Sequence, residues 1–300
     1  MNDRPVLVVG ASGLMGGHLT RVFGATRAVT GTAHEQSADD LVPLDMRDRA
    51  AARTLVEELR PAGVICPAAV SNVERCELEP AATRTVNVDG TLGLAAAAHA
   101  VGATFVFFSS EYVFDGTDGP YDEAREISPI NEYGRQKVEV EQALPDLTGG
   151  NYIVARVSCV YGHERRRKNF VFQLWSALTD GREFRTPGDQ IGTPTAAANA
   201  AEVVRDLLDG SERGTFHVAG AERMLRSDLA RVAAEELGLD PHLIRPVPTD
   251  ELGLAAPRPR GAGLLIERAS AAAPTPLIGP REGIRHMLAA GPLAVADGAA

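Results

Sequence analysis

A glycine-rich turn near the start of the chain constrains its fold more than any other feature. A short β-branched run at residues 6–9 leads directly into Gly10-Ala11-Ser12-Gly13-Leu14-Met15-Gly16, and apolar residues then recur at helical spacing. Glycines placed in this way permit a tight turn, close approach of the backbone to a pyrophosphate and close packing of helix on strand. The amino end of the helix would direct its N–H groups at phosphates. The pattern predicts a dinucleotide-binding unit, and the alternative is an ordinary tight turn.

Short apolar runs alternate with helical patterns through residue 150. Such alternation predicts an α/β fold built on a Rossmann-type doubly wound parallel sheet, in which ligands bind at the carboxyl ends of the strands. The rhythm changes after residue 160, where a smaller C-terminal substrate-binding domain is expected. The predicted division is a dinucleotide-binding domain at 1–160 to which 195–220 return, a substrate-binding domain at 161–194 and 221–288, and a tail at 289–300 for which we expect disorder.

Two further segments follow predicted strands and bear on a bound dinucleotide. Asp45 and Met46 come after the third strand and are candidates to border an adenine. The alternative for this segment is a helix cap, a role that the neighbouring Asp48 suits. Ala68 and Ala69 follow the fourth strand, where small side chains let a cofactor lie against the backbone.

The identity of the cofactor is not fixed by the segment after the second strand. An acidic residue there would bind the 2′-hydroxyl of NAD, and a basic residue would accommodate the 2′-phosphate of NADP. Residues 32–37 contain neither Arg nor Lys, and the acidic Glu35 comes late. The choice between NADP and NAD therefore stays open.

The acidic charge balance narrows the classes of partner. The chain has 300 residues, a formal net charge of -10 and a sequence pI of about 5.2, which argues against nucleic acid or an anionic membrane as the main partner. The three cysteines, Cys66, Cys76 and Cys159, lack metal-ligand spacing and suit a reducing compartment, as small buried residues. No metal site is predicted. The amino terminus lacks a signal-peptide pattern, so we expect a cytoplasmic location.

Three polar residues in the middle of the chain suggest acid–base chemistry. Tyr133 and Lys137 lie four residues apart, so they share one face of a helix, and an ammonium beside a phenol lowers the pKa of the phenol. Ser110 follows the apolar run 104–108, a predicted buried strand whose carboxyl end would hold a ligand. Tyr133 could also be a core residue with a satisfied hydroxyl, since a lone Tyr-x-x-x-Lys is common by chance. Its combination with the glycine-rich turn favours the catalytic interpretation.

A basic loop follows the predicted strand at 152–157. Residues 163–169 read His-Glu-Arg-Arg-Arg-Lys-Asn, and four consecutive cations in an acidic protein could attract a phosphorylated substrate. The alternative is a solvated loop, which is what most charge runs are. His217 alternates with apolar residues on a later predicted strand, so we expect it to be structural.

A set of motifs recurs in order over nearly the whole chain. They are Ala-Ala at 68–69, Val-Asn-Val-Asp-Gly at 86–90, Ser-Ser-Glu-Tyr-Val-Phe-Asp-Gly at 109–116, Pro-Ile-Asn-Glu-Tyr-Gly at 129–134, Asp-Gln-Ile-Gly-Thr-Pro-Thr at 189–195 and Ala-Pro-Arg-Pro-Arg at 256–260. With the glycine pattern, Ser110 and Tyr133-x-x-x-Lys137, the chain resembles the extended short-chain dehydrogenase/reductase superfamily. More narrowly, it resembles the dTDP-4-dehydrorhamnose reductase family.

This resemblance implies reduction of the C4 ketone of a nucleotide-linked 4-keto-6-deoxy sugar by NADPH or NADH, in deoxysugar biosynthesis. It assigns Tyr133 as general acid, Lys137 as the group that lowers the pKa of Tyr133 and holds the nicotinamide ribose, and Ser110 as a hydrogen-bonding partner of the carbonyl. The implied cofactor-binding residues are Gly10, Ser12, Gly13, Leu14, Met15, Gly16, Asp45, Met46, Ala68, Ala69, Tyr133 and Lys137. The implied substrate-binding residues are Val70, Glu111, Val113, Ser158, Arg167, Asn169 and Gln190.

Three positions depart from the family pattern, which leaves the identity of the sugar substrate open. Ser110 stands where members usually carry Thr, Glu111 where they carry Asp, and Val70 where an aromatic residue is usual. A related 4-keto-6-deoxy sugar is therefore a close competitor as substrate. An epimerase or dehydratase of the superfamily is one alternative function. Another is a non-catalytic NADP-binding regulatory subunit that resembles the beta subunit of methionine adenosyltransferase. A homodimer is a further expectation.

Overall fold

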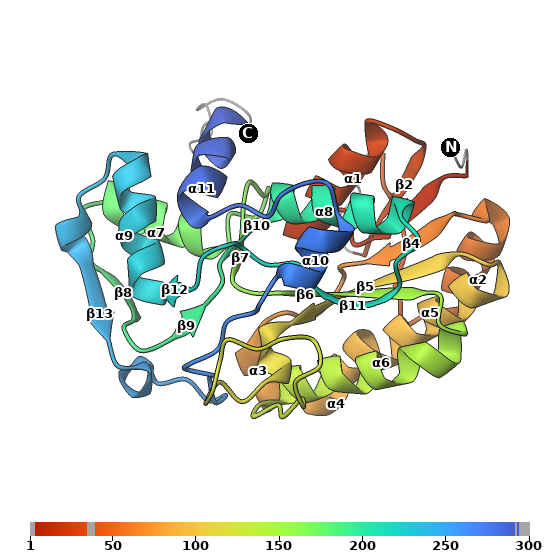
Figure 1. Ribbon diagram of the computed structural model, residues 1–300, viewed down its shortest axis with the longest axis horizontal. Coiled ribbons are helices and arrows are strands. Elements are labelled where there is room, and N and C mark those ends of the chain that lie inside the picture. The colour runs from red at the N-terminus through yellow and green to blue at the C-terminus, as the bar shows by residue number, and fades with distance from the viewer. Residues whose placement is uncertain (1–3, 35–39, 292, 294–300) are drawn as a thin grey trace.

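The computed structural model describes residues 4–34, 40–291 and 293. Its centre is a seven-stranded parallel sheet in the order β11-β6-β5-β4-β1-β2-β3 (Figure 1). The order reverses between β1 and β4, as at the switch point of a doubly wound sheet, so the predicted α/β architecture is confirmed. The strands are β1 (Val6–Val9), β2 (Val29–Ala33), β3 (Val42–Pro43), β4 (Gly63–Cys66), β5 (Thr104–Ser110), β6 (Tyr152–Val157) and β11 (Gly214–His217).

Helices cover both faces of this sheet, and side chains that alternate along each strand enter two separate cores. Val6 and Val8 of β1 belong to the core beneath α1, α8 and α10, whereas Leu7 and Val9 belong to the core beneath α2, α5 and α6. Because both faces are buried, the strands read as continuous apolar runs. The helices are α1 (Leu14–Gly24), α8 (Ala197–Asp209) and α10 (Glu267–Ala272) on one face, and α2 (Arg49–Leu59), α5 (Thr91–Ala100) and α6 (Glu132–Thr148) on the other.

A smaller lobe lies at one end of the sheet, where α7, α9 and α11 surround a third core (Figure 1). Its elements are β7 (Val160–Tyr161), α7 (Phe170–Thr179), β8 (Phe184–Pro187), β9 (Ile191–Gly192), β10 (Thr195–Ala196), β12 (Met224–Leu225), α9 (Arg226–Leu237), β13 (Ile244–Val247) and α11 (Pro280–Ala289). Between β4 and α5 lie α3 (Val73–Leu78), α4 (Pro80–Arg84) and a π-helical turn (Thr85–Gly90). Strand β11 pairs with β6 in the central sheet, as the predicted return of 195–220 requires, while the domain boundaries stay a prediction.

Several local predictions can be compared with the structure directly. Asp48 caps α2 by accepting hydrogen bonds from the next helical N–H groups, and His217 is fully buried, so both structural interpretations are confirmed. Cys159 is only partly buried, unlike Cys66 and Cys76, which corrects the expectation for that residue. Leu293 is buried in the core of the smaller lobe, so disorder is the wrong prediction for this residue. Residues 292 and 294–300 of the predicted tail lie outside the described residues.

The described residues contain neither a membrane-spanning helix nor a cluster of metal ligands. In the part of the chain that the structure describes, no helix has the length and apolar character needed to cross a membrane. Over the same residues, no group of three or more His, Cys, Asp or Glu side chains could hold a metal ion.

The glycine-rich turn brings α1 into unusually close contact with β1. Gly10 adopts a φ of 87°, which favours glycine, and the chain then reverses into the helix. A Cβ atom at Gly16 would lie 2.0 Å from the Gly10 carbonyl oxygen and 2.7 Å from the Ala11 Cα. The contact therefore depends on the absence of a side chain at residue 16.

We expect Gly16→Ala to lower the free energy of unfolding by about 1–3 kcal/mol, because the backbone must shift to admit the methyl group. Gly17→Ala is the matched control, since a Cβ there would meet only the Ala11 carbonyl oxygen, at 3.7 Å. The control should be neutral or more stable by up to about 1 kcal/mol, owing to the higher helix propensity of alanine. Urea unfolding followed by circular dichroism measures both variants. Equal midpoints would contradict the proposed dependence on Gly16.

Candidate active site

The glycine-rich turn lies at the switch point of the sheet, between the carboxyl ends of β1 and β4. A Cβ atom at Gly10 would lie 2.8 Å from the Ala68 Cβ, so the two segments touch there. Gly13 is the exposed N-cap of α1 and supplies no side-chain cap, while a Cβ at this residue would meet only the Gly10 carbonyl oxygen, at 3.4 Å. The turn therefore leaves room that a pyrophosphate can fill. The other predicted contacts here are partly buried: Ser12, Leu14, Met15 and Ala69.

Polar side chains meet beyond β2 and β3, at the edge where the adenosine is expected. The Arg47 guanidinium donates hydrogen bonds of 2.7–2.9 Å to the Asp45 carboxylate and thereby lowers the pKa of Asp45 to about 2. The His34 Nδ1 lies 3.9 Å from the Asp45 Oδ2. The Met46 side chain is buried in the core, so contact of this residue with an adenine, which stays a prediction, would involve its backbone.

The three candidate catalytic residues come from the end of β5 and the start of α6. Tyr133 and Lys137 lie one turn apart on α6, and the Lys137 Nζ is 5.5 Å from the centroid of the Tyr133 ring. The Lys137 ammonium donates a hydrogen bond of 2.7 Å to the Phe108 carbonyl oxygen of β5. Ser110 is the last residue of β5, and its Oγ accepts a hydrogen bond of 3.2 Å from the Tyr112 N–H. The predicted pair of Tyr133 and Lys137 thus lies where α6 contacts the end of β5.

The start of α6 is held in place by two close contacts. The Asn131 side chain accepts a hydrogen bond from the Gly134 N–H and donates one of 2.9 Å to the Pro257 carbonyl oxygen. A Cβ atom at Gly134 would lie 2.1 Å from the Tyr112 carbonyl oxygen, so the helix lies directly against the segment that follows β5. These contacts fix the position of Tyr133 relative to Ser110 and Tyr112.

Burial dominates the acid–base properties of this pair. It raises the pKa of Tyr133, and the Tyr112 and Cys76 side chains act in the same direction. Burial lowers the pKa of Lys137 to about 8, partly offset by Cys66 and Glu141. The net shift of the Tyr133 pKa is therefore upward, opposite to the predicted direction, because desolvation of the phenol outweighs the attraction between the Lys137 ammonium and the phenolate. That ammonium is bonded to the Phe108 carbonyl.

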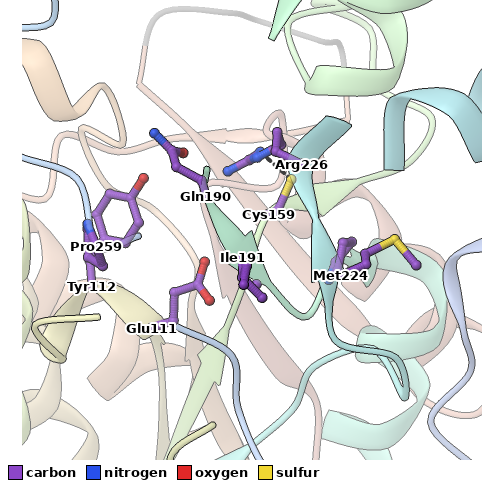
Figure 2. A pocket seen from close by; sticks show the side chains of 10 residues that line it. Glu111, Tyr112, Cys159, Gln190, Ile191, Met224, Arg226 and Pro259 are labelled. Carbon is purple, nitrogen blue, oxygen red and sulfur yellow. Dashed lines mark hydrogen bonds between the residues drawn. The ribbon is translucent and has the colours of Figure 1, made fainter. Parts of the chain in front are cut away.

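A small pocket lies between the sheet and the smaller lobe, next to the catalytic residues. Its walls come from the segment after β5, the turn between β6 and β7, the segment around β9, the start of α9 and the loop before α10. The lining residues are Glu111, Tyr112, Cys159, Gln190, Ile191, Gly192, Pro194, Met224, Arg226 and Pro259 (Figure 2). Tyr112 contacts Tyr133 edge to face, with ring centroids 6.1 Å apart, which connects this pocket to the catalytic pair.

Glu111 is an acidic residue of the pocket whose pKa is strongly shifted. Its side chain is 5% exposed, and burial raises its pKa to about 7, with Ser158 and Arg226 opposing this effect. The Glu111 Oε2 has no hydrogen-bond partner among the described residues. A Cβ atom at Gly192 would lie 2.8 Å from the Ser158 Oγ and 3.1 Å from this oxygen, so the predicted substrate residues Glu111 and Ser158 meet here.

The other predicted substrate residues occupy different surroundings. Gln190 lines the pocket, and its Nε2 donates a hydrogen bond to Thr249. Val113 is fully buried in a core cluster, so its side chain is not available to a substrate, which corrects that prediction. Arg167 and Asn169 lie on the basic loop before α7, where the Asn169 Nδ2 binds the Gly162 carbonyl and Glu164. The Asn169 Oδ1 is buried without a partner among the described residues.

Val70 is held at the end of β4 by a residue that had no predicted role. The Asn87 side chain accepts a hydrogen bond of 2.7 Å from the Val70 N–H and donates one of 3.1 Å to the Val70 carbonyl oxygen. It also donates to Gln136 of α6, at 2.8 Å. Asn87 therefore ties the loop after β4 to the catalytic helix. The motif at 86–90 contained this residue, but only the fold shows what it contacts.

Two arginines near the pocket also had no predicted role. Arg226 begins α9, and Arg258 belongs to the segment 254–260, which crosses from the smaller lobe to α3. The Arg258 guanidinium pairs with Glu74 at 2.5 Å and lies 6.0 Å from the centroid of the Tyr112 ring. Arg258 belongs to the motif at 256–260, but only the fold shows what it contacts, and Arg226 lies in none of the motifs.

Comparison with known proteins decides the family. A family model described as the RmlD substrate binding domain matches residues 4–291. The chain belongs to this family. A dTDP-4-keto-6-deoxy-D-glucose reductase of Streptomyces niveus is 34% identical over 263 residues, which cover 87% of this chain and 88% of that relative.

Other relatives of this chain carry names that describe two different functions. The crystal structure of a dTDP-4-dehydrorhamnose reductase from Bacillus anthracis in complex with NADP is 26% identical, with a TM-score of 0.87 over 96% of this chain and 100% of the other. The methionine adenosyltransferase 2 subunit beta of Pongo abelii is 32% identical over 272 residues, which cover 87% of this chain and 80% of that protein. The resemblance drawn from the sequence is therefore confirmed at the level of the family.

We expect Gly13→Ala to weaken binding of NADP by tenfold or more while changing the free energy of unfolding by no more than about 1 kcal/mol. The added methyl group meets only one protein atom at van der Waals distance but enters the space assigned to the pyrophosphate. Quenching of protein fluorescence by cofactor gives the affinity, and urea unfolding gives the stability. Unchanged affinity in a stable variant would show that the cofactor does not approach residue 13.

Proposed function

We propose that this protein is an NAD(P)H-dependent reductase that acts on the C4 ketone of a nucleotide-linked 4-keto-6-deoxy sugar in deoxysugar biosynthesis. The observation that carries the proposal is the joining of Ser110, Tyr133 and Lys137 at the carboxyl edge of the sheet that also holds the glycine-rich turn. Relatives named as reductases of dTDP-linked keto sugars, and NADP in the Bacillus anthracis structure, support it.

The roles of the three residues follow from their contacts. A reduced nicotinamide cofactor held on the glycine-rich turn would supply the hydride. Because the Ser110 Oγ accepts a hydrogen bond from Tyr112, its own hydrogen is free to donate to the sugar carbonyl. Tyr133 stays protonated at neutral pH, since burial raises its pKa, and donates its proton to the forming alkoxide. The ammonium of Lys137 stabilises the phenolate that this transfer leaves behind.

The edge beyond β2 and β3 favours NADP over NAD. No cation follows β2 directly in residues 32–34, but His34 and Arg47 both lie at the Asp45 carboxylate. A basic group at this edge suits the 2′-phosphate of NADP, and Arg47 would have to exchange its Asp45 partner for that phosphate. The cytoplasmic location and the homodimer expected from the sequence stay predictions.

A regulatory subunit is the second candidate function. The 32% identity to a methionine adenosyltransferase subunit is similar to the 34% identity to a keto-sugar reductase, so overall similarity does not separate the two. The polar pocket beside Tyr133 favours the reductase, because a cofactor-binding subunit without turnover has no need of it. Capture of a stoichiometric partner, together with absence of sugar turnover, would instead favour the regulatory role.

The test is oxidation of NADPH and of NADH, followed by absorbance, with several dTDP-linked 4-keto-6-deoxy sugars. We expect oxidation that depends on the sugar, and a loss of about 10²–10⁴-fold in kcat for Tyr133→Phe, because the general acid is removed. NADP should bind the variant as it binds the wild-type protein. Full turnover by Tyr133→Phe would refute the assignment. Conversion of sugar without net consumption of reduced cofactor would indicate an epimerase or dehydratase.

The pKa of Lys137 predicts a pH dependence. Since burial lowers this pKa to about 8, the ammonium is present below that pH and is lost above it, so kcat/KM for reduction should fall as pH rises through about 8. Lys137→Arg should have lower activity but no such decline up to about pH 10, because the guanidinium stays charged. Glu111→Gln is the control for the other group that titrates in this range. A decline that disappears in Glu111→Gln and persists in Lys137→Arg would contradict this assignment.

A further inference from the structure

Two charged side chains face the pocket beside the catalytic residues without a complete set of protein partners. The Glu111 Oε2 is buried and accepts no hydrogen bond from the described residues, and Arg226 forms no ion pair with any described carboxylate. Figure 2 shows the Glu111 carboxylate and the Arg226 guanidinium entering the space between the lobes from opposite sides. Buried polar groups in native structures are almost always hydrogen-bonded, so the Glu111 Oε2 calls for a partner, and the partly buried Arg226 guanidinium lies across the pocket from it.

Arg226 is held firmly, although it has no carboxylate partner. Its backbone N–H donates a hydrogen bond of 2.8 Å to the Gln190 carbonyl oxygen. Its guanidinium lies 5.3 Å from the centroid of the Phe170 ring and donates one hydrogen bond to the Cys159 sulfur, a weak acceptor. Cys159 itself has a φ of 38°, an uncommon conformation that directs the chain around the pocket. Most guanidinium donors thus remain available to a ligand.

The size of the pocket limits what can enter. Its volume is about 10 Å³, close to the space that a single water molecule needs. The enclosed part of the pocket is therefore too small for a hexose ring or a phosphate. A hydroxyl group fits, and it can donate to a carboxylate oxygen while it accepts from a guanidinium.

We propose that this pocket binds one hydroxyl group of the substrate sugar, with Glu111 accepting its hydrogen and Arg226 donating to its oxygen. Arg226 is then a specificity-determining residue of the reaction, on the opposite lobe from the catalytic Tyr133. This inference rests on the proposed function. Glu111 directly follows Ser110, for which we propose contact with the C4 carbonyl, so we assign the hydroxyl to the adjacent carbon, C3. The carbon on the other side of C4 carries no free hydroxyl in a pyranose.

The test compares dTDP-4-keto-6-deoxy-D-glucose with its 3-deoxy counterpart on the wild-type protein. We expect kcat/KM to be about 10²-fold or more higher for the hydroxylated sugar, because the deoxy sugar leaves the Glu111 Oε2 without a partner and Arg226 with only its Cys159 contact. Arg226→Met should lose at least about tenfold with the hydroxylated sugar and much less with the deoxy sugar. Arg231→Met is the matched control: this arginine also lies on α9 but is exposed and pairs with Asp228, so the variant should behave as the wild-type protein.

Calorimetric binding of the same two sugars in the presence of NADP⁺ separates this inference from the proposed function, since no reduction can occur there. Binding that depends on the 3-hydroxyl and on Arg226, without turnover under NADPH, would support the pocket and refute the reductase. Equal kcat/KM and equal binding for both sugars in the wild-type protein would mean that the pocket holds only a water molecule, and would overturn the proposal. Binding of neither sugar would overturn both. The wild-type comparison needs no variant, so a folding defect of Arg226→Met cannot obscure the result.

Discussion

The hydrogen bond from the Lys137 ammonium to the Phe108 carbonyl oxygen is the contact on which the candidate site depends. It joins α6 to β5 across the end of the sheet, and it places Tyr133, one turn earlier on α6, beside the Ser110 that ends β5. A buried ammonium is costly unless it is hydrogen-bonded, so this contact both orients the helix and makes the burial tolerable. Burial still lowers the pKa of Lys137 to about 8, near the range where an enzyme works.

The smaller lobe completes the site from the opposite side. Segment 254–260 crosses to the sheet domain, where Glu74 accepts hydrogen bonds from the Ala255 N–H and the Arg258 guanidinium, and Asn131 binds the Pro257 carbonyl. The same Asn131 caps the catalytic helix α6. A displacement of the smaller lobe would therefore also displace the start of α6. The position of Tyr133 thus depends on the position of the pocket wall that the smaller lobe supplies.

Sequence reasoning recovered the parts of the site that local spacing encodes. The three glycines, the four-residue spacing of Tyr133 and Lys137, and the position of Ser110 after a strand each express a local geometric requirement, and the fold agrees with them. The position of Arg226 depends instead on how α9 packs against the turn after β6, which no local pattern encodes. Val113 likewise points into the core and away from the pocket. Its direction depends on the short 3-10 turn at Glu111–Val113.

The pKa values of the site were the least predictable from sequence, because they depend on burial by side chains from many different elements. Beneath the catalytic helix, Glu141 pairs with Arg156 at 2.6 Å, and both side chains are at most 6% exposed. Cys66 and Glu141 oppose the effect of burial on Lys137, but burial raises the pKa of the Cys66 thiol to about 11, so this thiol stays uncharged at neutral pH. Arg156 holds the Glu141 carboxylate in place, while burial lowers the pKa of the neighbouring His217 to about 3 and keeps it neutral. A buried ion pair adds little to stability by itself. Its place one turn beyond Lys137 gives it another effect, since it helps the ammonium stay charged in a site that would otherwise neutralise it.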